Sequence, residues 1–238
     1  MRYNKISITK IFLLFIIGSI TVSCTKKAIE NDYGDPTVFE EEIQVFESAD
    51  LQISPPNNAI VCIGSSSIRG WHETIHDDLA PLTIIARGFG GSNMNDALYY
   101  TDRIILPYEP RAVIIYEGDN DIAQGIYPNK IDDIFTEVIN KIHRQLPQCR
   151  IYFLSIKPSA SRWNMWPKMV QTNKLIAEKC ANDGRLIFVD VSTAMLNEDG
   201  EPRDEIFLSD ELHMNRSGYE IWANILKPIL LESELHFE

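Results

Sequence analysis

A cluster of three serines is the first feature of this chain that suggests chemistry. Ser65, Ser66 and Ser67 follow Gly64, which ends a short apolar run over residues 59–63. A sharp turn from a strand into a helix lifts a serine clear of the sheet and places its N–H at a helix N-terminus, where negative charge is stabilised. An acyl-transfer nucleophile needs both properties. Taken alone, the serines could instead simply cap the helix, because serine is a favoured N-cap residue.

Polar or glycine-rich clusters also follow other predicted strands. They span residues 87–93, 117–121 and 208–213. Together they offer backbone N–H donors of glycines, the side-chain amide of Asn120, and the pair Asp210 and His213. A nucleophile, a base, a group that orients the base and an oxyanion hole are the requirements of acyl transfer. Each cluster alone is also typical of a turn or a solvated loop.

The elements that must position these groups alternate along the chain. Apolar runs predict strands at residues 60–63, 82–86, 112–116, 151–155 and 186–191, with amphipathic helical patterns between and after them. Such alternation predicts right-handed βαβ units and a parallel sheet covered by helices on both faces. Ligands of such sheets bind beyond the carboxyl ends of the strands, where the polar clusters fall.

With these blocks in this order, the chain resembles the SGNH (GDSL-type) hydrolases from about residue 36 to the C-terminal helix. The matching blocks are Gly64 with Ser66, residues 88–91, residues 118–121, and Asp210 with His213. The Asp and Leu of the GDSL name are Ser65 and Ser67 here, so three serines are candidates and the register from Gly64 favours Ser66. The resemblance implies an α/β fold, a flavodoxin-like three-layer α/β/α sandwich with a five-stranded parallel sheet in the order 2-1-3-4-5.

The resemblance also implies a role for each matched residue. Ser66 would attack an ester carbonyl, His213 would act as general base and acid, and Asp210 would orient His213. The N–H groups of Ser66 and Gly91 and the amide of Asn120 would form the oxyanion hole. The implied enzyme is a serine esterase that needs no metal and no cofactor. Enzymes of this kind include carbohydrate deacetylases, lysophospholipases and thioesterases.

A loop after the fourth predicted strand suggests how a substrate could be held. Residues 158–167 place Arg162, Trp163 and Trp166 close together. Indole rings pack on the C–H faces of sugars, and a guanidinium binds hydroxyls or a carboxylate. We therefore expect acetyl or other short acyl groups on carbohydrates as substrates. For the function, the alternatives are a lysophospholipase or thioesterase and a non-catalytic glycan-binding lipoprotein. For the two tryptophans, the alternative is packing on the next helix.

A competing motif lies just after the serines. Residues 72–76 spell His-Glu-x-x-His, with His72 and His76 as the two ligands that zinc proteases place on one helix face. The segment is short, begins close to the serine cluster and runs into two aspartates and Pro81. Neither a buried apolar flank nor a third ligand is evident, so we interpret it as a polar end of the first helix.

The N-terminus is typical of a bacterial lipoprotein. Arg2, Lys5 and Lys10 precede an apolar run over residues 11–20, which is too short to span a bilayer comfortably. We predict a signal peptide over residues 1–23, a lipid anchor on Cys24, a tether over residues 24–35 and a hydrolase domain over residues 36–238. The protein would then be a membrane-anchored lipoprotein of the bacterial cell envelope, periplasmic or on the outer surface. Ordinary secretion is the alternative.

Charge and cysteine content limit the partners. Removing residues 1–23 takes away three cations and no acids, so the net charge moves from −12 to −15. An acidic chain is poorly suited to phosphate backbones, which argues against nucleic acid as a partner.

Cys62, Cys149 and Cys180 would remain, an odd number that excludes a complete disulfide framework. Pairing of Cys149 with Cys180 stays open.

Overall fold

The computed structural model describes Met1 and residues 32–238. The strands are β1 (Ile60–Gly64), β2 (Ile84–Gly88), β3 (Ala112–Tyr116), β4 (Arg150–Leu154) and β5 (Leu186–Val189). The α-helices are α1 (Glu40–Gln52), α2 (Ser66–Trp71), α3 (Ile75–Leu79), α4 (Met94–Ile104), α5 (Asp119–Ala123), α6 (Pro128–Gln145), α7 (Trp166–Cys180) and α8 (Arg216–Glu234). Short 3₁₀ helices are η1 (Pro36–Phe39), η2 (Leu106–Tyr108), η3 (Ala160–Met165), η4 (Thr193–Met195), η5 (Asp204–Ile206) and η6 (Leu235–Phe237).

The five strands form one parallel sheet in the order β2-β1-β3-β4-β5, which confirms the predicted order. The chain leaves β1 toward β2 on one side and returns to β3 on the other. The gap between β1 and β3 is therefore the topological switch point, where ligands of open α/β sheets bind. Ser66 follows β1 directly, and Asn120 lies in α5 just after β3.

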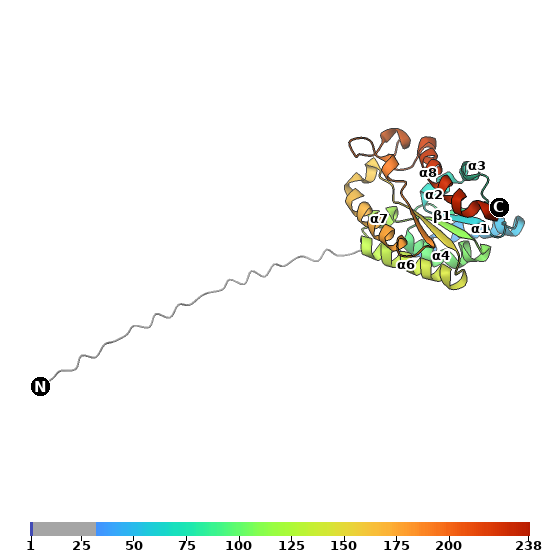
Figure 1. Cartoon of the computed structure of the whole chain (residues 1–238), viewed down its shortest axis with the longest axis horizontal. Coiled ribbons are helices and arrows are strands. Elements are labelled where there is room, and N and C mark those ends of the chain that lie inside the picture. Colours follow the sequence, from blue (N-terminus) through green and yellow to red (C-terminus); the bar gives the residue numbers. More distant parts are fainter. Residues whose placement is uncertain (2–31) are drawn as a thin grey trace.

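Two hydrophobic clusters, one on each face of the sheet, make the three layers. Val61 and Val113 point into a cluster that includes residues of α1, α4, α6 and α7, whereas Ile60 and Ile114 point into a cluster with α2, α3 and α8. Figure 1 shows α2, α3 and α8 above the sheet and α4 and α6 below it. Alternate side chains of each strand are thus buried on opposite faces, which explains the nearly continuous apolar runs in the sequence.

Strand boundaries differ slightly from those predicted. The second strand was expected at residues 82–86 and is observed at Ile84–Gly88, although Leu82 is buried as the pattern indicated. Thr83 contributes its carbonyl to the N–H of Ile60, and regular pairing between β1 and β2 begins at the next residue. Buried residues therefore begin before the hydrogen-bonded pairing of β1 and β2. Because an apolar pattern indicates burial and not pairing, it placed the start of the strand too early.

Several expectations concern the N-terminus or the cysteines. The predicted signal peptide, Cys24 and most of the tether lie outside the described residues. Of the predicted tether, Tyr33 is described, and its side chain packs against the core. Cys62, Cys149 and Cys180 are buried and unpaired. In the part of the chain that the structure describes, no helix has the length and apolar composition needed to cross a membrane.

A buried carboxylate ties the C-terminal helix to the sheet. Glu234, in α8, is fully buried and accepts hydrogen bonds from Arg150 Nη2 at 2.7 Å and from the Tyr152 hydroxyl at 2.6 Å, both in β4. Arg111 Nε lies 3.3 Å from the same carboxylate. Glu234 is the last residue of α8, so this contact holds the C-terminal end of that helix against β4.

We expect Glu234→Ala to lower the free energy of unfolding by about 3–5 kcal/mol, because it removes the buried carboxylate that Arg150, Tyr152 and Arg111 share. Chemical denaturation followed by circular dichroism measures the effect. Glu232 is exposed on the same helix, so Glu232→Ala is the matched control and should change stability by less than about 0.5 kcal/mol. Equal effects of the two substitutions would contradict the assignment.

Candidate active site

The turn after β1 separates the three serines by exposure. Gly64 has φ +153°, and a Cβ there would overlap the carbonyl oxygen of Tyr116, so only glycine fits. Ser65 is the N-cap of α2 but makes no capping hydrogen bond through its side chain. Ser65 and Ser67 are each 3% exposed, whereas Ser66 is partly exposed at the first position of the helix. Of the three hydroxyls, that of Ser66 is therefore the one presented to solvent.

His213 lies against this serine. Its Nε2 is 2.9 Å from Ser66 Oγ, and its Nδ1 is 2.6 Å from Asp210 Oδ2. The other oxygen of Asp210 accepts the backbone N–H groups of Leu212 and His213 at 3.0 and 2.9 Å. These hydrogen bonds, with the His213 contact foremost, hold the pKa of Asp210 well below its usual range. An ionised carboxylate here favours the tautomer with its proton on Nδ1, which leaves Nε2 free to accept a proton from Ser66.

The predicted oxyanion donors follow β2 and β3. Gly91 is exposed and has φ +91°, a left-handed conformation that favours glycine. Asn120 is partly exposed in α5, and its Nδ2 donates to the Ser92 carbonyl at 2.8 Å. An amide nitrogen carries two hydrogens, so this bond fixes the side chain and leaves the second hydrogen for another acceptor. The Gly91 N–H and the Asn120 amide are linked, because Asn120 bonds to Ser92, the residue after Gly91.

The loop after β4 lies beside this arrangement. The N–H of Ser161 donates to the Glu211 carbonyl, between Asp210 and His213 in sequence, at 3.3 Å. Trp163 and Trp166 are partly buried and stack on each other, with ring centroids 5.8 Å apart. Trp166 also packs against the hydrophobic core. The loop therefore reaches the His213 loop, and its two rings form one aromatic surface.

Arg162, predicted as a substrate contact, makes an ion pair within the protein. Its Nη1 lies 2.6 Å from Asp119 Oδ1, and Lys157 Nζ lies 3.2 Å from Asp119 Oδ2. Burial alone would raise the pKa of Asp119, but Lys157 and Arg162 lower it below its usual range. Asp119 directly precedes Asn120, so this ion pair joins the loop after β4 to the helix that holds the amide.

Sequence reasoning assigned no role to three buried polar groups near the site: Ser92, Glu117 and Asp119. Each adjoins a residue of a matched block, but a sequence does not show which side chains meet. For Glu117 there was one signal. It directly follows the fully buried strand β3 and is itself only 1% exposed. An acidic residue continuing an apolar strand is unusual, because burial of an unpaired charge is costly.

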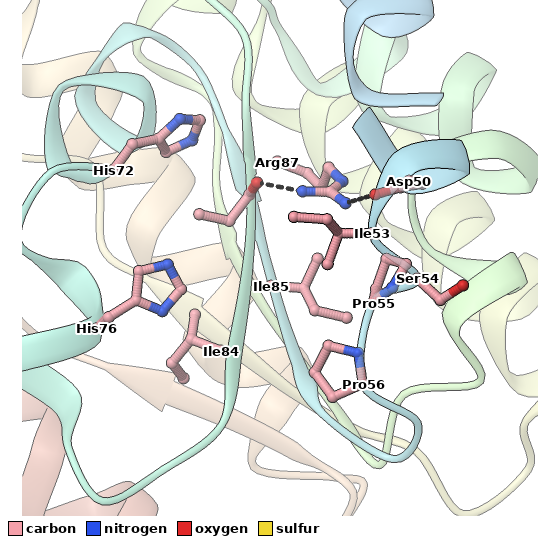
Figure 2. Close-up of a pocket in the computed structure, with 11 residues that line it drawn as sticks. Asp50, Ile53, Ser54, Pro55, Pro56, His72, His76, Ile84, Ile85 and Arg87 are labelled. Atoms are coloured by element: carbon pink, nitrogen blue, oxygen red, sulfur yellow. Dashed lines mark hydrogen bonds and ion pairs between the residues drawn. The ribbon is translucent and has the colours of Figure 1, made fainter. Parts of the chain in front are cut away.

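The His-Glu-x-x-His segment does not form the single helix that zinc proteases use. Helix α2 ends at Trp71 and α3 begins at Ile75, so His72 lies in the turn between the helices and His76 lies in α3. His72 Nε2 accepts the N–H of Gly88 at 2.9 Å, and burial and the Arg87 guanidinium lower the pKa of His72 to about 4. Figure 2 shows His72 and His76 lining a pocket beside β2, and the residues of the candidate active site do not line it. Among the described residues, no group of three potential ligands is placed to hold a metal ion.

Solved structures share this fold at low sequence identity. A GDSL-like lipase from Bacteroides thetaiotaomicron is 17% identical with a TM-score of 0.68, and the alignment covers 80% of this chain and 98% of that one. The acetyl-xylooligosaccharide esterase Axe2 from Geobacillus stearothermophilus is 14% identical with a TM-score of 0.57, over 72% and 93% of the two chains. The OSK domain of Drosophila Oskar is 18% identical with a TM-score of 0.59, over 75% and 88%.

These similarities establish the fold, and the sequence establishes the family. No curated protein matches the chain in sequence. Residues 60–221 match the GDSL-like Lipase/Acylhydrolase family, and this segment runs from β1 into α8. It therefore contains the serine turn, the loops after β2 and β3, the loop after β4 and the Asp210–His213 pair. The chain is a member of the GDSL-like lipase/acylhydrolase family.

Proposed function

We propose that the protein is a serine carboxyl-ester hydrolase with Ser66 as nucleophile. The observation that carries this proposal is the hydrogen-bonded series from Ser66 Oγ through His213 to Asp210, with distances of 2.9 and 2.6 Å. A binding protein needs no such series. Membership of an acylhydrolase family supports the same class of reaction.

In the proposed reaction, His213 Nε2 takes the proton of Ser66 Oγ as the oxygen attacks the ester carbonyl. The Ser66 and Gly91 N–H groups and the Asn120 amide stabilise the negative oxygen that forms. His213 then gives its proton to the departing alcohol, which leaves an acyl group on Ser66. Water attacks this ester with His213 again as base, and the acid is released with the serine restored.

The substrates that we propose are acetyl or other short acyl esters of carbohydrates. Support comes from the stacked rings of Trp163 and Trp166 beside the His213 loop, since indole faces pack well on sugar C–H groups. Arg162 gives Nη1 to Asp119, and its other N–H groups can donate to a sugar hydroxyl. Axe2, whose fold is similar, acts on acetylated xylooligosaccharides, which supports the proposal by analogy alone.

We further propose that the chain is anchored in the bacterial envelope through lipid on Cys24. The basic and apolar order of residues 2–20 and the position of Cys24 support this proposal. Asp32 lies eight positions after Cys24, a stretch that can span at most about 30 Å. An anchor at Cys24 would therefore keep the enzyme close to the membrane surface, where envelope glycans are available.

The first test concerns the nucleophile. Ser66→Ala should lower kcat for p-nitrophenyl acetate by about 10⁴-fold or more, because it removes the hydroxyl that contacts His213 Nε2. Ser65→Ala and Ser67→Ala are the matched controls and should keep most of the activity. Labelling with a phosphonate followed by peptide mapping identifies the serine directly. A label on Ser65 or Ser67 would overturn the assignment.

A second test concerns the sugar. Trp163→Ala should raise KM for an acetylated xylooligosaccharide severalfold and leave p-nitrophenyl acetate almost unaffected, since the small ester has no sugar to hold. Trp163→Phe keeps a flat ring and should restore part of the affinity. Trp163 is the better probe, because Trp166 also packs on the core. Activity that rises steadily with acyl length beyond eight carbons would argue for a lipid substrate instead.

The third test concerns the anchor. Full-length protein expressed in a bacterium should sediment with the membrane fraction, and Cys24→Ser should move it to the soluble fraction, because the thiol would be the lipid attachment site. Mass spectrometry of the wild-type N-terminal peptide should show a diacylated cysteine. A wild type that is already soluble and carries no lipid would favour ordinary secretion.

A further inference from the structure

Ser92 connects the two loops that we propose to form the oxyanion hole. It follows Gly91 in sequence, and its carbonyl accepts the Asn120 amide at 2.8 Å. Its side chain is fully buried, so its hydroxyl does not face a substrate. A shift of Ser92 would therefore move both the Gly91 N–H and the Asn120 amide.

The Ser92 hydroxyl is held in turn by Glu117. Ser92 Oγ donates to Glu117 Oε1 at 2.6 Å, and both side chains are buried. The other carboxyl oxygen, Glu117 Oε2, has no hydrogen-bond partner among the described residues. An ionised carboxylate is stable in a protein interior only when its oxygens are well hydrogen bonded or paired with a cation. This geometry therefore suits a neutral carboxylic acid.

The surroundings of Glu117 point in the same direction. The acidic groups that face it are Asp96 of α4 and Asp119 and Asp121 of α5, of which Asp119 is paired with cations. Burial and the Asp121 carboxyl raise the pKa of Glu117 well above its usual range. Asp121 itself accepts the Tyr33 hydroxyl at 2.7 Å and the Met94 N–H at 3.1 Å. A negative charge on Glu117 would also oppose the negative oxygen that forms at the neighbouring oxyanion hole.

We propose that Glu117, in its neutral form, and Ser92 act as a positioning pair that fixes the Gly91 N–H and the Asn120 amide as oxyanion donors. This inference rests on the proposed esterase function. Neither residue is assigned a contact with the reacting atoms, so both act through the donors that they hold. The pair would contribute to kcat, because its effect is felt only when charge develops on the carbonyl oxygen.

Four variants of the full chain test the pair, assayed with p-nitrophenyl acetate. Glu117→Gln keeps a neutral acceptor of similar shape and should retain kcat within about threefold. Glu117→Ala and Ser92→Ala should each lower kcat by about 10- to 100-fold with KM little changed, which is less than the roughly 100- to 1,000-fold loss expected for Asn120→Ala. The double variant Ser92→Ala/Glu117→Ala should be no worse than the poorer single variant, because both residues act through one hydrogen bond.

Wild type and Ser66→Ala are measured first. An active wild type and an inactive Ser66→Ala establish the esterase independently of the pair, so that failure of the function and failure of the inference are distinguished. The inference is then overturned if Glu117→Gln loses as much kcat as Glu117→Ala, if Ser92→Ala keeps full kcat, or if KM rises while kcat stays constant. Circular dichroism checks folding, and Ser92→Ala and Glu117→Gln decide the question if Glu117→Ala does not fold.

Discussion

The hydrogen bond between Ser66 and His213 is the contact on which the candidate site depends. It joins two residues that are 147 positions apart, one after the first strand and one before the last helix. The distance between α2 and α8 must therefore be fixed by packing. The Tyr219 hydroxyl of α8 donates to the Ser67 carbonyl of α2 at 2.9 Å, and its ring stacks on Trp71 at 5.9 Å. At Gly70, a Cβ would overlap the Tyr219 hydroxyl, so a side chain there would displace Tyr219 from this contact.

The order of strands and helices was predictable because each strand is buried on both faces and ends at polar or glycine-rich residues. The matched blocks also named Ser66, Asn120, Asp210 and His213 in advance, since each follows directly from a strand end or a short motif. The register from Gly64 already favoured Ser66 over its neighbours, and the folded chain adds a physical reason. Only the folded chain shows that Ser65 and Ser67 are 3% exposed while Ser66 faces solvent. The roles of these residues in catalysis remain predictions.

Loop contacts other than those that the matched blocks imply were not predictable. Arg162 was expected to face a substrate, because its neighbours in sequence are aromatic, yet its Nη1 is bonded to Asp119 from a different loop. The Ser92–Glu117 contact is of the same kind. The His-Glu-x-x-His segment shows that a local sequence motif can match although the structure it requires is absent. Its spacing matches the zinc-protease pattern, but this spacing places two histidines on one face only if the helix is continuous. In this chain a turn lies between Trp71 and Ile75.

Two of the buried acidic groups behind the site, Asp119 and Glu117, differ because their partners differ. Asp119 is buried but pairs with Lys157 and Arg162, so its charge is compensated. Glu117 is equally buried, lacks a cation and accepts from a hydroxyl, so a neutral form is favoured. These two carboxyl groups therefore add little net negative charge behind the oxyanion hole that we propose.

Sheet topology alone does not select this chemistry. A GDSL-like lipase, an acetyl-xylooligosaccharide esterase and the OSK domain of Oskar share the fold with this chain at 14–18% identity. What distinguishes one chain from another must therefore lie in the loops at the carboxyl ends of the strands. In this chain Gly64 at the end of β1, Gly91 after β2 and Gly118 after β3 have positive φ angles. Each allows a sharp turn that other residues would strain, and together they bring a hydroxyl, a backbone N–H and an amide to the same end of the sheet.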